Sequence, residues 1–199
     1  MIHQLSSEIA DYLFYRKIIT IDNYDVYCYG LEMIISTILG FVLIMICGVL
    51  TDSFFHSLLF YFLFVTLRMY TGGYHADTHL TCKATLCLSF LAAEALSRYL
   101  CNFSQYIIYW IITIICLFNI ISVLIISPVE CHAKPVTEKV KAKNRKKSIL
   151  LYVLISLLEI VILRMSYIEL SMFISIVMAN VVVLMYIGKI KEERRASNL

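Results

Sequence analysis

The stretch Tyr106–Ile126, YIIYWIITIICLFNIISVLII, contains no charged residue and is apolar almost throughout. A helix needs about 20 predominantly apolar residues to cross the hydrocarbon core of a bilayer. A helix also satisfies its own backbone hydrogen bonds, so a long apolar run inside a membrane favours helical structure. The stretch therefore predicts a transmembrane helix.

Five further apolar runs flank this stretch. They are Met33–Leu50, Phe54–Met69, Ala84–Leu100, Ile149–Leu163 and Leu170–Ile187. The whole chain of 199 residues is 61% hydrophobic and 16% charged, whereas soluble domains are about 25% charged. The sequence therefore predicts an all-α integral membrane protein with about six transmembrane helices. The runs Phe54–Met69 and Ile149–Leu163 are short, and we expect them to tilt or to end within the membrane.

The N-terminal residues form an amphipathic pattern. Ile2, Leu5, Ile9 and Leu13 recur at helical spacing, with polar residues between them. The pattern predicts an interfacial helix from Ile2 to about Tyr29, lying on the membrane surface. A short helix packed on the bundle is the alternative. The chain is then expected to form one membrane domain over residues 1–199, with an interfacial segment 1–30, a bundle 33–187 and a tail 188–199.

With six spans, successive polar segments would face opposite sides of the membrane, and the basic residues are distributed unevenly between these two sides. Of the 17 Lys and Arg residues, all except Arg98 and Arg164 fall in segments that would face the same side. Cytoplasmic loops of membrane proteins carry an excess of Lys and Arg. The distribution therefore predicts an even number of spans in the cytoplasmic membrane, with both termini in the cytoplasm. The segment 127–148 is expected to be a basic cytoplasmic loop.

The polar segment 68–83, RMYTGGYHADTHLTCK, interrupts the apolar runs. Its Gly72-Gly73 pair allows the backbone to leave a helix. Irregular backbone near membrane depth is tolerated when it packs in protein or lines a wet cavity. We therefore expect a functional site here, on the cytoplasmic side.

Cys82 and His75 suit nucleophilic catalysis. A thiol becomes a strong nucleophile when a neighbouring base raises its thiolate fraction, and histidine has the basicity for this near neutral pH. Seven residues apart, the two side chains would be separated by about 10 Å on one straight helix. Contact between the two side chains therefore requires a bend in the backbone. The alternative to a catalytic pair is a polar loop in which the cysteine has no catalytic role.

Two rival sites use other histidines. His75 and His79 have the i,i+4 spacing of metal ligands, but Ala76 stands where a zinc protease carries its glutamate base. Cys131 and His132 are adjacent, and adjacent side chains on a helix diverge. Neither rival fits catalysis as well as the pair His75 and Cys82.

Several polar residues within the apolar runs have structural interpretations. Glu94 and Arg98, spaced i,i+4, predict an ion pair near a helix end. Asn119 and Asn180 predict hydrogen bonds between helices. Arg68 either positions a substrate and stabilises negative charge or anchors the end of a span at the membrane surface.

The motif Arg68, Gly72-Gly73-x-His75-Ala76 and Cys82 resembles that of the accessory gene regulator B (AgrB) family, membrane endopeptidases that process quorum-sensing propeptides. The amphipathic N-terminus, the hydrophobic segments and the loop with Ser127-Pro128-Val129 and Lys134-Pro135 extend the resemblance over most of the chain. The residues just before Lys134 match the family's loop less well.

The resemblance implies a bacterial thiol protease with Cys82 as nucleophile and His75 as base, and with no cofactor or metal. Its substrate would be an AgrD-like propeptide with an amphipathic helix, a cyclisable segment and an acidic tail. Tail removal would leave an acyl-enzyme that cyclises to a thiolactone or lactone. Acidic tails or lipid headgroups would contact the basic residues Lys134, Lys139, Lys141, Lys143, Arg145, Lys146 and Lys147.

Other functional classes remain open. A small transporter would show paired internal repeats, and none is visible in the sequence. A non-enzymatic membrane scaffold would not require a Gly-Gly-x-His segment followed by a cysteine. The weak net charge of +3 gives no reason to expect nucleic-acid binding. The sequence leaves open whether the chain acts alone or as a homodimer.

Overall fold

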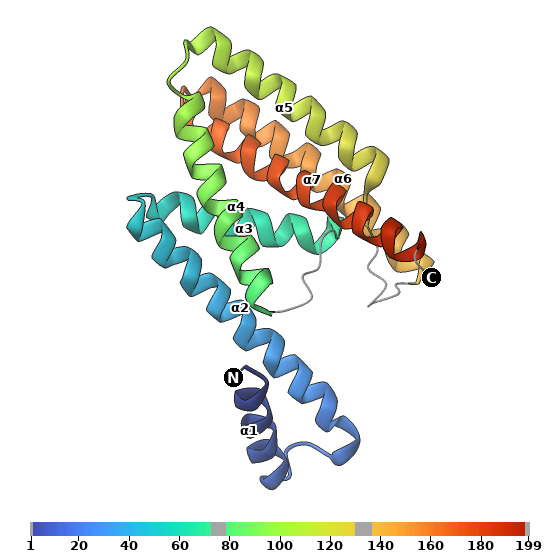
Figure 1. Cartoon of the computed structure of the whole chain (residues 1–199). Coiled ribbons are helices and arrows are strands. Elements are labelled where there is room, and N and C mark those ends of the chain that lie inside the picture. Colours follow the sequence, from blue (N-terminus) through green and yellow to red (C-terminus); the bar gives the residue numbers. More distant parts are fainter. Residues whose placement is uncertain (1, 73–78, 130–136, 198–199) are drawn as a thin grey trace.

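The computed structural model describes residues 2–72, 79–129 and 137–197, and within these ranges every regular element is helical. This confirms the predicted all-α class. The elements are α1 (Ile2–Tyr15), the short 3₁₀ helix η1 (Ile21–Asn23), α2 (Tyr24–Leu50), α3 (Phe54–Thr71), α4 (His79–Leu100), α5 (Gln105–Ile126), α6 (Glu138–Arg164) and α7 (Ile168–Ser197) (Figure 1).

Each of the six apolar runs lies within one of the helices α2 to α7. Among the described residues, five helices are long and apolar enough to cross a membrane: α2 together with η1, α3, α4, α5 and α7. α6 contains the run Ile149–Leu163, but this apolar stretch is bounded by Lys147 and Arg164 and interrupted by Glu159. The described residues therefore contain five clear candidate spans, and α6 carries a shorter apolar stretch.

The N-terminal region differs from the single helix predicted over Ile2 to about Tyr29. α1 ends at Tyr15, Lys17 adopts a left-handed conformation with φ 57°, and α2 begins at Tyr24. The Tyr24 hydroxyl donates a 2.6 Å hydrogen bond to Asp11 of α1. The prediction was wrong in extent because periodicity does not reveal a chain reversal whose two arms pack together. α1 folds back along the beginning of α2 (Figure 1), and its placement on the membrane surface stays a prediction.

α7 forms the centre of the bundle. It contacts α3, α4, α5 and α6, and α5 and α6 lie alongside it (Figure 1). The α7 side chains that form the core are Met172, Phe173, Ile174, Ile176, Val177, Met178, Val181, Val182 and Met185. The apolar residues of α7 are buried within the protein, whereas most of those on the other helices face outward.

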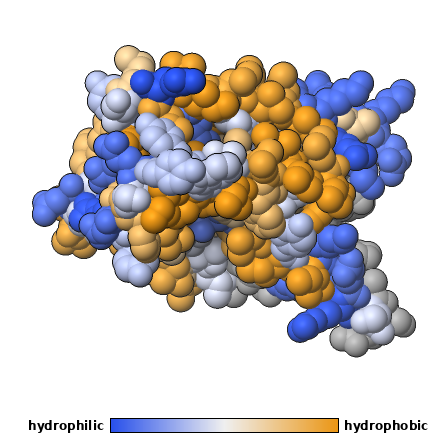
Figure 2. All heavy atoms as spheres, turned by 90° about the horizontal axis from the view of Figure 1, so that it is seen from above, coloured by the Kyte–Doolittle hydropathy of each residue, from blue (hydrophilic) through white to orange (hydrophobic). Residues whose placement is uncertain are grey.

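The outer surface carries many exposed apolar side chains, including those of α2 and α5. Apolar residues cover much of the face seen from above, with hydrophilic residues toward its edges (Figure 2). A soluble monomer rarely exposes apolar patches of this extent. The outer surface is therefore suited to contact with lipid.

Polar side chains connect the helices, as predicted for the two mid-span asparagines. Asn119 of α5 donates a 3.2 Å hydrogen bond to the Ser175 carbonyl of α7. Asn180 of α7 donates a 2.9 Å bond to the Ser89 carbonyl of α4. Both predictions are confirmed, and both bonds fix the packing of α7 against its neighbours.

Candidate active site

The segment 68–83 is more helical than predicted. Residues 68–71 form the last turn of α3, and residues 79–83 belong to α4. Gly72, which ends α3, is the described residue between the two helices. Gly73 and His75 lie outside the described residues. The prediction that the backbone leaves the helix at the Gly-Gly pair is confirmed at Gly72, where α3 ends. The sequence pattern did not show that the next helix already begins at His79.

Gly72 is held in a conformation and a contact that require glycine. Its φ of 69° and ψ of −146° lie in a region of backbone space that is essentially restricted to glycine. A Cβ atom at this position would overlap the carbonyl oxygen of Val129. Gly72 and Val129 form an isolated parallel bridge, and the Val129 amide donates a 2.9 Å hydrogen bond to the Thr71 carbonyl.

Ser127 and Pro128 bring Val129 to this position from the end of α5. The buried hydroxyl groups of Ser127 and Ser148 share a hydrogen bond of 2.6 Å. Arg145 of α6 donates a 3.1 Å bond to the Leu124 carbonyl of α5. The ends of α3 and α5 and the N-terminal half of α6 therefore form one junction, which connects two motifs far apart in the sequence.

Residues 138–148 of the expected loop 127–148 belong to α6, which begins at Glu138. Lys, Glu and Arg are good helix formers, and the acidic Glu138 in the first turn suits the positive end of the helix dipole. For residues 138–148 the loop prediction was wrong, because hydropathy distinguishes polar from apolar segments and does not distinguish a loop from an exposed helix.

The basic residues therefore lie mainly on a helix. Lys139, Lys143, Arg145, Lys146 and Lys147 are exposed and Lys141 is half-buried, whereas Lys134 lies outside the described residues. The Lys147 ammonium lies 4.8 Å from the ring centroid of Tyr70 in the last turn of α3. Lys141 and Arg145 line a cavity of about 350 Å³ together with Ser127 and Pro128.

Cys82 lies in the first turn of α4, and its side chain is exposed. The N-terminal end of a helix presents backbone N–H groups and favours negative charge, which suits a thiolate. His75, Cys131 and His132 lie outside the described residues. The pairing of Cys82 with His75, the metal alternative and the Cys131–His132 alternative thus stay hypotheses.

Arg68 lies one turn before the end of α3 and is half-buried. Its guanidinium carbon lies 5.7 Å from the ring centroid of Phe64, one turn earlier on the same helix. The contact orients the guanidinium along α3. Arg68 therefore lies close to the junction at Gly72, and its role stays a prediction.

A second polar cluster lies where the α2–α3 turn meets the end of α4. The predicted ion pair is confirmed, since Arg98 donates a 2.7 Å hydrogen bond to Glu94. Sequence reasoning missed His56, whose Nδ1 lies 2.9 Å from the other Glu94 oxygen. Arg98 also donates a 2.8 Å bond to the Thr51 carbonyl. The contact between His56 and Glu94 depends on the packing of the beginning of α3 against the end of α4.

Comparisons with known proteins agree on one family. Residues 6–187 match the family described as accessory gene regulator B. An AgrB-like protein of Clostridium perfringens (strain SM101 / Type A) is 28% identical over 210 residues, covering 96% of this chain and 94% of the relative. An AgrB-like protein 2 of Clostridium perfringens (strain 13 / Type A) is 26% identical, covering 81% and 78%. No solved structure matches. The chain therefore belongs to the accessory gene regulator B family, membrane proteins that take part in processing quorum-sensing peptides.

Proposed function

We propose that this protein is a membrane cysteine endopeptidase that removes the C-terminal tail of an AgrD-like propeptide. The observation that carries the proposal is the exposed Cys82 in the first turn of α4. A short segment that contains His75 joins this turn to Gly72, which is anchored to Val129. The chain matches the AgrB family across this whole region.

The proposed cleavage transfers an acyl group from nitrogen to sulfur. His75 takes the proton of the Cys82 thiol, and the sulfur attacks the carbonyl carbon of the scissile peptide bond. Arg68 is proposed to position the substrate and to stabilise the negative charge on the carbonyl oxygen. When the C–N bond breaks, His75 returns the proton to the departing amine of the tail. The remaining peptide is then held on Cys82 as a thioester.

Cyclisation is proposed to release the peptide from the enzyme. A cysteine thiol or serine hydroxyl of the substrate attacks the thioester carbonyl, and the thiolactone or lactone leaves as Cys82 recovers its proton. Exchange of one thioester for another is nearly balanced, so the unfavourable step is the earlier conversion of the scissile amide into the Cys82 thioester. A site sheltered by the membrane also slows hydrolysis of the thioester.

Trapping the acyl-enzyme tests the proposal. A propeptide whose cyclising residue is replaced by alanine is expected to be cut and to remain attached to the enzyme. Intact mass spectrometry should then show a hydroxylamine-sensitive adduct that peptide mapping places on Cys82. The Cys82→Ala variant should form no adduct, while Cys131→Ala should form it as the wild-type protein does. An adduct on Cys131, or cleavage without any adduct, would refute the proposed mechanism.

The basic face of α6 is proposed to bind the acidic tail of the propeptide. Lys143 and Lys146 are exposed, and clustered positive charge raises the local concentration of an anionic partner. The double variant Lys143→Gln, Lys146→Gln in neutral detergent is expected to raise KM by about threefold to tenfold at low salt. This difference should shrink as salt rises, because exposed charges are screened over about 10 Å at 0.1 M.

A matched control uses the two basic residues that follow α1. The double variant Arg16→Gln, Lys17→Gln removes the same charge from exposed positions beside α1, which packs on α2 and lies apart from α6 (Figure 1). It is expected to leave KM unchanged. An equal rise in KM for both double variants would assign the effect to net charge and exclude specific binding of the tail. Unchanged KM in the α6 variant would leave lipid headgroups as the partner of these residues.

Both termini are proposed to lie in the cytoplasm, which places Cys82 on the inner side of the membrane. The unequal distribution of Lys and Arg supports this orientation. A membrane-impermeant maleimide is expected to leave Cys82 and Cys131 unlabelled in intact cells and to label the exposed Cys82 after permeabilisation. Labelling of Cys82 in intact cells would reverse the orientation.

A further inference from the structure

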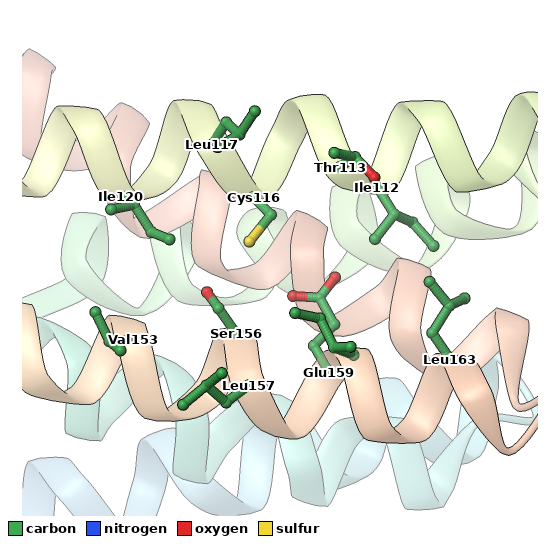
Figure 3. A pocket seen from close by; sticks show the side chains of 11 residues that line it. Ile112, Thr113, Cys116, Leu117, Ile120, Val153, Ser156, Leu157, Glu159 and Leu163 are labelled. Carbon is green, nitrogen blue, oxygen red and sulfur yellow. The ribbon is translucent and has the colours of Figure 1, made fainter.

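A polar cluster lies inside the apolar contact between α5 and α6. Cys116 of α5 and Ser156 and Glu159 of α6 line a cavity of about 300 Å³. Their sulfur and oxygen atoms point into the gap between the two helices (Figure 3). These residues lie on other helices than Cys82, and the proposed cleavage does not use them.

The polar atoms of the cavity are incompletely satisfied. Glu159 is 1% exposed, and its Oε1 accepts a hydrogen bond from the Ser175 hydroxyl of α7. Glu159 Oε2 and the Ser156 hydroxyl, which is 4% exposed, have no hydrogen-bond partner among the described residues. Buried polar groups are nearly always hydrogen-bonded, and a buried carboxylate is costly without a cationic partner. The cavity therefore suits a ligand that donates hydrogen bonds and carries positive charge.

The apolar walls of the cavity indicate what the part of the ligand beyond its polar head should be. Leu117, Leu157 and Ile160 line it and are each more than half exposed on the outer surface. The cavity therefore opens toward the lipid phase, not toward the junction at Gly72. Its volume corresponds to roughly ten groups of the size of a water molecule. This space accommodates a short apolar chain in addition to a small polar head.

We propose that this cavity binds a primary ammonium group carried by an apolar chain. An ammonium has three donors and no acceptor, and the cavity offers three acceptors in Glu159 Oε2, Ser156 Oγ and the weaker Cys116 Sγ. A hydroxyl head would donate a single hydrogen bond and would not neutralise Glu159. A carboxylate head would place a second negative charge beside it. The ligand class is thus an amphiphilic amine, supplied either as a free amine or as an aminolipid.

Protection of Cys116 from alkylation tests the proposal in the full-length protein. The protein is placed in phosphatidylglycerol nanodiscs and treated with N-ethylmaleimide, and modification of each cysteine is followed by mass spectrometry of its peptides. Octylamine is expected to slow the modification of Cys116 in a saturable manner. Octanol and octanoate at the same concentration should not slow it. Cys87 of α4, which does not line the cavity, is the internal control and should react at an unchanged rate.

Two variants decide whether the amine acts through the carboxylate. Glu159→Gln is expected to raise the octylamine concentration for half-protection by about tenfold, since a hydrogen bond to a charged group is lost. Glu169→Gln removes an exposed charge outside the cavity and should not change it. If Glu159→Gln does not fold, Ser156→Ala removes another acceptor and should also weaken protection.

The pattern of protection separates the outcomes. Equal protection by octanol, or by octylamine in both wild type and Glu159→Gln, would refute ammonium binding and show nonspecific partition. Added phosphatidylethanolamine distinguishes the sources of the amine. If it protects Cys116 as octylamine does, the ligand is an aminolipid, and if only octylamine protects, it is a free amine.

Discussion

Replacing Cys82 with alanine is expected to lower kcat/KM for propeptide cleavage by at least about 10⁴-fold, because the acyl-enzyme route loses its nucleophile. Cys82 is exposed in the first turn of α4, so the substitution creates no cavity in the core. The thermal midpoint of the Cys82→Ala protein should therefore remain within a few degrees of the wild-type value. Cleavage is measured on the purified protein in detergent with the cognate propeptide.

The companion variants identify the base and control for the other thiols. His75→Ala is expected to lower kcat by about 10²-fold to 10⁴-fold, the usual contribution of a general base. Cys87→Ala, on the same helix as Cys82 but away from the first turn, should retain activity. A Cys82→Ala protein that still cuts, together with an inactive Cys131→Ala protein, would move the nucleophile to the other loop.

Replacing Gly72 with alanine is expected to destabilise the junction between α3 and α5 by about 2–4 kcal/mol. The alanine Cβ would overlap the Val129 carbonyl oxygen, and the backbone angles at Gly72 are restricted to glycine. Relief of the overlap separates the two segments and breaks the bond from the Val129 amide to the Thr71 carbonyl. Both the thermal midpoint and kcat should fall, because the junction fixes Gly72, from which the chain continues to Cys82.

Gly30 of α2 provides the matched control for Gly72. A Cβ atom added at Gly30 meets no atom within 4 Å, and alanine is more favourable than glycine in a helix by about 1 kcal/mol. Gly30→Ala should therefore be as stable as the wild-type protein or slightly more stable. Gly72→Asn should be as damaging as Gly72→Ala, because its Cβ makes the same overlap. Equal thermal midpoints for the alanine variants at positions 30 and 72 would contradict the proposed role of Gly72.

The candidate site was only partly predictable from local sequence. The Gly72-Gly73 pair indicated the end of α3, and Cys82 and His75 indicated thiol chemistry. Sequence patterns did not show that Cys82 lies in a helical turn or that Lys139 and its basic neighbours continue into α6. Exposed helices and loops share a polar composition, so only the hydrogen-bonded backbone distinguishes them.

Contacts between distant segments required the folded chain. Nothing local to Gly72 identifies Val129 as its partner, and nothing local to Glu94 identifies His56. The same holds for Glu159, which in the sequence is one charge in a short apolar run. Its buried carboxylate accepts a hydrogen bond from the Ser175 hydroxyl of α7.

The sequence alone determined the membrane class, the six apolar runs and the residues able to perform thiol chemistry, because hydropathy and side-chain chemistry are local properties. The tertiary structure decided which helix became the buried centre, where α1 turns back and which carbonyl meets Gly72. It also placed the unsatisfied oxygen of Glu159 in a cavity open to lipid. These features depend on which surfaces pack together, and packing partners are chosen by shape and hydrogen bonding across the whole bundle.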